Sequence, residues 1–357
     1  MTIWPSRWMN YCWLLMRLSA IIFNYTTQAN TKFAYALIKN MKNKTINPSS
    51  ILIIALVFLS SCQAPEAYRN ALEAFSQGAQ LEMKERFPTQ DATSGAELPN
   101  DFIFFDDLYK ASGTVDAAMP FSKYYAKALA QADAALKGES QLKKNNMLDN
   151  AYAIKALTQW RQGNYEAANQ LARQAEPLLR QDNGGEDDVR DLAMMQALPG
   201  LINIEKAYAA LEASGKAMEN MAEISTLGAE ERDVVYKKVK AIYETFVTDD
   251  TDGATSISRG LALIQRAIDN VEDNDAIVLY LRNAQLASMD TWGDMLLNVF
   301  TTSRRLSVSQ FAPDEVKWIN DERQMYDKLL ADYLSNLAEE LPGGEDNKLY
   351  RYWKKVL

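Results

Sequence analysis

Along most of the chain, apolar residues recur at the three- and four-residue spacing of an amphipathic helix. From position 62 onward Ala, Leu, Glu, Lys, Gln and Met dominate, and the alternation typical of a strand is almost absent. The sequence therefore predicts an all-α fold. The predicted helices cover residues 66–85, 120–136, 147–162, 165–180, 187–213, 229–246, 256–271, 275–297, 314–340 and 347–355.

Helix-breaking residues separate these segments. Gly138, Gly163 and Gly253 each follow a helical pattern at the point where it stops. Pro199 and Gly200 instead fall inside the fifth predicted helix, so we expect this helix to kink or divide there.

One spacing of aromatic and small residues occurs twice, forty positions apart. Small residues let one helix approach its neighbour closely, and the leading aromatic fills the wedge between the helices. The pattern predicts antiparallel helical hairpins that stack on one another. A weaker third copy comprises Ile257, Gly260, Ile264 and Ala267. The two clear copies comprise Tyr125, Ala128, Ala132 and Ala135, and Tyr165, Ala168, Ala172 and Ala175.

Residues 151–175 resemble a tetratricopeptide repeat (TPR). The resemblance implies a right-handed superhelix, or solenoid, of stacked hairpins, and Lys155 and Gln159 depart from the family pattern. The residues at the family's small, turn-glycine and aromatic positions are Ala156, Gly163, Tyr165, Ala168 and Ala175.

In that family the first helix of each hairpin lines a concave binding surface. The resemblance therefore implies that Asn150, Leu157, Trp160 and Arg161 are candidates to face a partner protein. A second interpretation remains open for Trp160, because Ala153, Leu157 and Trp160 form one apolar stripe that a hairpin core would bury.

Charge divides the chain into a basic leader and an acidic body. Residues 1–61 hold six Lys or Arg and no Asp or Glu, whereas the remainder holds 32 basic and 47 acidic residues. After Met41 come Lys42 and Lys44, and then nine apolar residues at 51–59. Nine residues are too few to span a bilayer, which needs about 20 in a helix. This arrangement is typical of an export signal.

The export signal ends in Leu59-Ser60-Ser61-Cys62, which resembles the lipobox of bacterial lipoproteins. The resemblance implies attachment of lipid, such as palmitate, to Cys62 and cleavage before it. The alternative is an ordinary cysteine. Gln63 follows in place of the aspartate that favours retention in the inner membrane. We therefore expect an outer-membrane lipoprotein of the bacterial envelope, facing the periplasm or the cell surface.

The domain organisation follows from these features. Residues 41–61 form the predicted signal peptide, and residues 62–357 form the TPR-like helical body, with a subdivision near 213–229. Residues 1–40 have two explanations: translation starts at Met41, or a leader precedes it as a disordered or membrane-associated segment around 9–24.

Composition excludes several kinds of chemistry. The absence of His rules out triads that depend on it, and Cys12 and Cys62 are the only cysteines. A net charge of −9 argues against nucleic-acid binding. The acidic run 249–253 fails the spacing of a calcium-binding EF-hand loop. A glycosidase-type carboxylate pair would need an aromatic cleft, which the sequence does not indicate. We therefore expect no enzyme activity, no metal and no cofactor beyond the lipid on Cys62.

Two functions remain. The first is a non-catalytic scaffold that binds another envelope protein or a transport complex. The second is a ligand-binding accessory, similar to the T-component lipoproteins of TRAP transporters. A scaffold needs an open groove, whereas an accessory needs an enclosed pocket with a few convergent polar groups.

Overall fold

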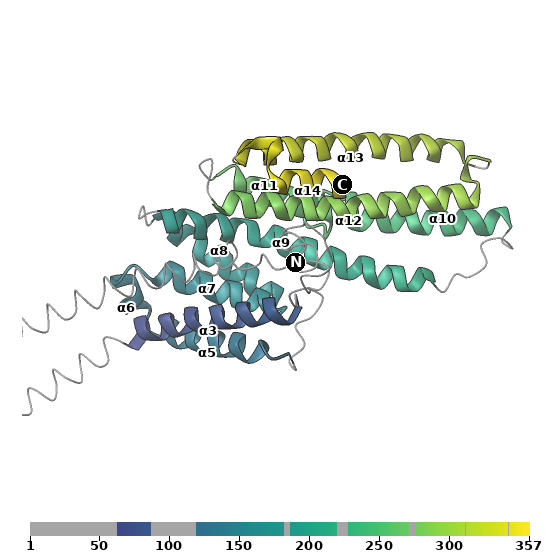
Figure 1. Cartoon of the computed structure of the whole chain (residues 1–357). Coiled ribbons are helices and arrows are strands. Elements are labelled where there is room, and N and C mark those ends of the chain that lie inside the picture. Colours follow the sequence, from purple (N-terminus) through teal and green to yellow (C-terminus); the bar gives the residue numbers. More distant parts are fainter. Residues whose placement is uncertain are drawn as a thin grey trace, which may run out of the picture. The chain divides into compact units, whose positions relative to one another are not determined.

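The computed structural model describes residues 63–86, 119–181, 186–219, 228–270, 276–310, 312–341 and 343–357. Its regular elements are all helical (Figure 1), and these ranges contain no strand. The prediction of an all-α protein is confirmed. The described residues fall into two compact units that divide between Asp191 and Leu192. Unit 1 precedes this division and unit 2 follows it. Residues 220–227 of the predicted subdivision interval 213–229 lie outside the described residues.

Within the described residues, unit 1 contains five complete helices, and four of them were predicted. The short helix α6 was not predicted, because six mostly polar residues give too little periodicity to be recognised. The helices are α3 (Gln63–Arg86), α5 (Ser122–Leu136), α6 (Glu139–Lys144), α7 (Leu148–Arg161) and α8 (Tyr165–Gln181).

Helices α3 and α5 of unit 1 pack side by side in opposite directions. Gly78 of α3 lies against the ring of Tyr125 near the start of α5, whereas Ala64 at the start of α3 lies beside Gly138 after α5. Their facing surfaces are rich in alanine, and such small side chains let the two backbones come close. The fully buried alanines are Ala71, Ala74, Ala128, Ala132 and Ala135.

A tight turn joins α7 to α8. Gly163 adopts a left-handed backbone conformation with φ of 75°, which favours glycine. The amide of Asn164 donates to the carbonyl of Gln159 at 2.9 Å. This turn ends α7 and reverses the chain, so α7 and α8 form the predicted hairpin.

The described part of unit 2 begins within a long helix and includes one π-helical turn and two 3-10 turns. The helices are α9 (Glu186–Glu219), α10 (Ala229–Tyr243), α11 (Ile257–Ile268), α12 (Ala276–Leu306), α13 (Pro313–Glu340) and α14 (Lys348–Val356). The turns are η2 (Glu244–Thr248), η3 (Val308–Gln310) and η4 (Gly344–Asp346).

Helix α9 runs without a break through Pro199. The expected division at this point does not occur. Gly200 instead faces Gly260 of α11, and a Cβ added to Gly200 would lie 2.7 Å from the carbonyl oxygen of Gly260. The glycine in the weaker third copy of the repeat thus permits a close helix crossing.

Helices α10 and α13 are connected by two tyrosine–glutamate hydrogen bonds. Tyr236 donates to Glu315 and Tyr243 donates to Glu322, both at 3.1 Å. Both partners advance by seven residues, so the helices run in the same direction. Trp292 of α12 donates to the Tyr243 hydroxyl at 2.9 Å. Burial raises the pKa of both tyrosines, so they remain protonated donors at neutral pH.

Buried polar side chains on α12 fix two further helices to it. Arg282, Asn283 and Gln285 are each at most 8% exposed. Arg282 donates to Gln265 of α11 at 2.8 Å, and the indole of Trp353 in α14 donates to Asn283 at 2.7 Å. These bonds hold α11 and α14 against α12 in defined positions.

Candidate functional site

The repeat residues of unit 1 differ in how far they are exposed to solvent. Tyr125 is 1% exposed, Tyr165 is partly exposed, and Gly163 lies in the exposed turn between α7 and α8. The six repeat alanines are buried in the interior of unit 1. Each is at most 1% exposed: Ala128, Ala132, Ala135, Ala168, Ala172 and Ala175.

The four groove candidates on α7 separate into two pairs. Trp160 and Arg161 lie in the interior, at 5% and 7% exposure, and the Arg161 guanidinium lies 5.0 Å from the centre of the Trp160 ring. Asn150 and Leu157 are partly exposed. Only Asn150 and Leu157 therefore reach the surface to any extent.

Arg161 belongs to a buried polar cluster that the sequence analysis missed. Its Nε donates to Oε2 of Glu82 at 3.2 Å, and its Nη2 donates to Oε1, which makes the contact bidentate. The Tyr125 hydroxyl donates to the same Oε2 at 2.6 Å. Glu82 is 3% exposed, and burial raises the pKa of Tyr125. The cluster joins α3, α5 and α7.

A signal for this cluster exists in the sequence. Ala71, Phe75, Gly78 and Glu82 follow one another at helical spacing, which places a single acidic residue on the apolar stripe of α3. Such a residue requires a buried cationic or hydrogen-bonding partner. Because the three side chains are almost inaccessible to solvent, we assign the cluster a structural role.

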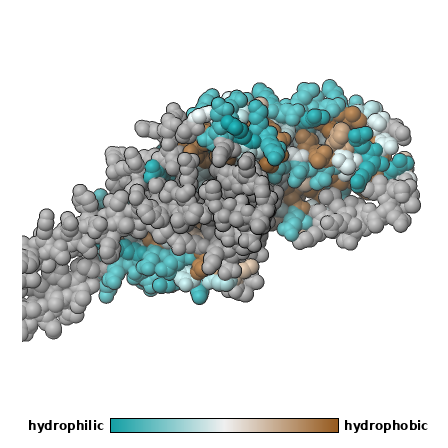
Figure 2. Space-filling model, in the orientation of Figure 1, coloured by the Kyte–Doolittle hydropathy of each residue, from teal (hydrophilic) through white to brown (hydrophobic). Residues whose placement is uncertain are grey.

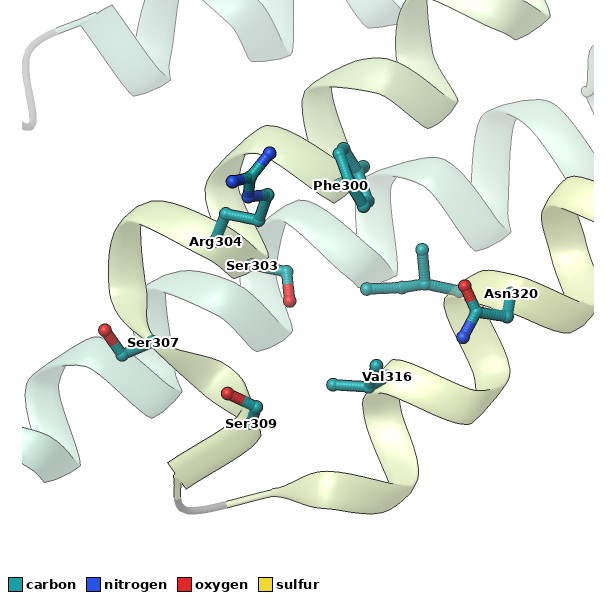
Figure 3. Close-up of a pocket in the computed structure, with 8 residues that line it drawn as sticks. Phe300, Ser303, Arg304, Ser307, Ser309, Val316 and Asn320 are labelled. Atoms are coloured by element: carbon teal, nitrogen blue, oxygen red, sulfur yellow. The ribbon is translucent and has the colours of Figure 1, made fainter.

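Unit 2 contains a pocket where α12 ends and α13 begins (Figure 3). Its volume is about 300 Å³. Residues from α12, the following turn and the first two turns of α13 line it. They are Phe300, Ser303, Arg304, Ser307, Ser309, Val316, Ile319 and Asn320.

Five of the eight lining residues are polar, and none is acidic. Ser303 is 6% exposed, and its hydroxyl points into the space between the two helices (Figure 3). The Arg304 guanidinium lies 5.7 Å from the centre of the Phe300 ring. Arg304 forms no ion pair with any residue in the described ranges. The pocket therefore combines an unpaired cation with neutral hydrogen-bonding groups.

Apolar surface accompanies this pocket. Figure 2 shows apolar residues gathered within the otherwise hydrophilic surface of unit 2. On the last turns of α12, Leu297 is 59% and Phe300 is 37% exposed.

The pocket was not predicted, because the predicted helix 275–297 stops short of the last turns of α12. The last turns of α12 give a weak helical signal, because they contain the poor helix formers Thr301, Thr302 and Ser303. The residues that could have indicated a site are the hydroxyl-rich run 301–309, followed by a proline-initiated helix.

Cys62 and the predicted leader lie outside the described residues. Within those residues, no helix combines the length and apolar character that crossing a membrane requires. The same part of the chain contains no cluster of three or more acidic, Cys or His side chains able to hold a metal ion.

No family model, curated protein or solved structure matches this chain.

Proposed function

We propose that this chain is a lipid-anchored protein of the bacterial envelope whose helical body binds another protein without catalysing a reaction. The observation that supports the binding role most strongly is the burial of both alanine series in unit 1. Stacked hairpins with small interfacial residues are the usual construction of helical repeat scaffolds, whose extended surfaces bind partners.

The arrangement of the unit 1 helices as stacked TPR-like hairpins belongs to the same proposal. Helices α3 and α5 form one antiparallel pair, and α7 and α8 form the next. We take these pairs as successive TPR-like hairpins of a right-handed stack. In this arrangement α7 is a first helix, and the partner contacts it around Asn150 and Leu157.

Membrane attachment is the second part of the proposal and depends on Cys62. A single acyl chain binds a bilayer reversibly, whereas two or three chains hold it firmly, because each buried CH₂ contributes about 0.8 kcal/mol. The lipobox-like sequence supports the modification, and Gln63 supports an outer-membrane destination.

Photo-crosslinking in intact cells tests the partner surface. A photoreactive residue replaces Asn150 or Leu157 in the full chain, and matched controls replace Arg173 or Gln174, two exposed positions on α8. We expect the α7 positions to form one discrete protein adduct that the α8 positions do not form. Mass spectrometry identifies the adduct. Its absence from both α7 positions, or equal yield from the α8 positions, would overturn the proposed surface.

A ligand-binding accessory of a transport system is the second candidate function. The observation that favours it is the pocket of about 300 Å³ in unit 2, where polar groups converge beside apolar side chains. In this alternative the helical body presents a small molecule to a membrane transporter and does not serve mainly as a scaffold.

A further inference from the structure

We propose that the pocket between α12 and α13 binds a small organic carboxylate, with Arg304 holding the carboxylate and Phe300, Val316 and Ile319 contacting a short apolar body. The inference rests on this pocket alone and does not depend on the partner surface proposed for α7.

The charge of the pocket favours an anion. The whole chain has a net charge of −9, yet the eight lining residues include one cation and no carboxylate. Asp314 and Glu315 lie in the first turn of α13 but do not line the pocket. Glu315 is already occupied by Lys240, whose ammonium lies 2.8 Å from it. Arg304 is thus left available to a ligand.

The neutral polar groups complete a hydrogen-bonding site. Ser303 is more than nine-tenths buried, and its hydroxyl points into the pocket (Figure 3). Neither Ser303 nor Asn320 forms a side-chain hydrogen bond with any residue that the structure describes. A hydroxyl and a carboxamide can both donate to a carboxylate, and Asn320 is exposed and so accessible to a ligand.

The remaining walls and the volume define the rest of the ligand. Ile319 is 4% exposed, and together with Val316 and Phe300 it forms the apolar part of the lining. About 300 Å³ is at the lower end of the range for small-molecule sites. A bare inorganic anion would leave the apolar wall uncovered, so we infer a small acid with a short branched or unbranched chain.

Ligand-observed NMR titration of the purified full chain with 4-methylpentanoate tests this site. The neutral 4-methylpentanamide, of the same shape, and inorganic phosphate serve as comparison ligands. We expect saturable binding of the acid and much weaker binding of both others, because the amide lacks the charge and phosphate lacks the apolar body. No saturable binding of the acid, or equal binding by either comparison ligand, would overturn the proposal.

Two adjacent arginines on α12 provide a matched pair of variants. Both side chains are exposed, but only Arg304 lines the pocket, and Arg305 does not. We expect Arg304→Gln to weaken acid binding roughly fivefold, since a charged hydrogen bond at a partly exposed site is lost. Arg305→Gln should leave the affinity unchanged, and an equal loss in both variants would contradict a specific role for Arg304.

A second variant tests the buried hydroxyl. Ser303→Ala removes the hydroxyl without adding bulk and should weaken binding of the acid, while circular dichroism verifies that the helices persist. Unchanged affinity in a folded Ser303→Ala variant would remove Ser303 from the site.

Discussion

Replacing Arg161 with Met should lower the free energy of unfolding of unit 1 by about 3–5 kcal/mol. The guanidinium forms two hydrogen bonds with Glu82, and both side chains are at most 7% exposed. Its removal takes a bidentate cation away from a buried carboxylate, while the hydrogen bond from the Tyr125 hydroxyl stays. Urea unfolding followed by far-ultraviolet circular dichroism measures the loss.

Two controls separate this desolvation effect from a general loss of packing. In the double variant Glu82→Gln with Arg161→Met neither charge of the pair remains, so most of the stability should return. Arg180→Met breaks an exposed ion pair with Glu176 on α8 and should cost at most about 1 kcal/mol. A loss below about 1 kcal/mol for Arg161→Met would show that the buried ion pair does not hold unit 1 together.

Substitution of Gly260 should destabilise unit 2 by about 1–3 kcal/mol for Ala and by more for Val. An added Cβ would lie 2.9 Å from the carbonyl oxygen of Gly200 and would also contact the side chain of Ile204. Ile204 can adjust its rotamer, but the Gly200 carbonyl moves only if α9 moves away from α11. Alanine in place of glycine normally stabilises a helix interior by about 1 kcal/mol. At Gly260 we expect the steric overlap of the added Cβ to outweigh this gain.

Gly228 provides the matched control for this prediction. It lies before α10 with φ of −68°, and an added Cβ there meets nothing closer than 3.7 Å. Gly228→Ala should therefore cost only about 0.5–1 kcal/mol, the ordinary loss when alanine replaces glycine at a helix N-cap. Equal stability of Gly260→Ala and the parent chain in thermal unfolding would mean that α9 and α11 do not cross closely at this point.

The helices of this protein could be predicted from the sequence because their apolar spacing is regular over many turns. The predicted segment 147–162 corresponds to α7 (Leu148–Arg161), and 314–340 corresponds to α13 (Pro313–Glu340). Contacts between helices determine features that the apolar spacing of a single helix does not predict. Gly200 read alone indicates a break, whereas its contact with Gly260 shows that it serves helix packing.

The candidate site was less predictable, because it depends on side chains that are distant in sequence. Arg161 appeared to be a groove residue because its partner Glu82 is 79 positions away. The pocket forms where the start of α13 packs against the last turns of α12, so that Ser303 and Asn320 both line it. Helical spacing describes one face of one helix and carries no information about which helix covers it.

Radioactive palmitate labelling of cells that express the full chain tests the anchored scaffold most directly. The parent chain and Cys12→Ala should incorporate label, whereas Cys62→Ala, expressed at the same level by immunoblot, should incorporate none and should keep the larger mass of the uncleaved precursor. Equal labelling of Cys62→Ala and the parent chain would contradict the account.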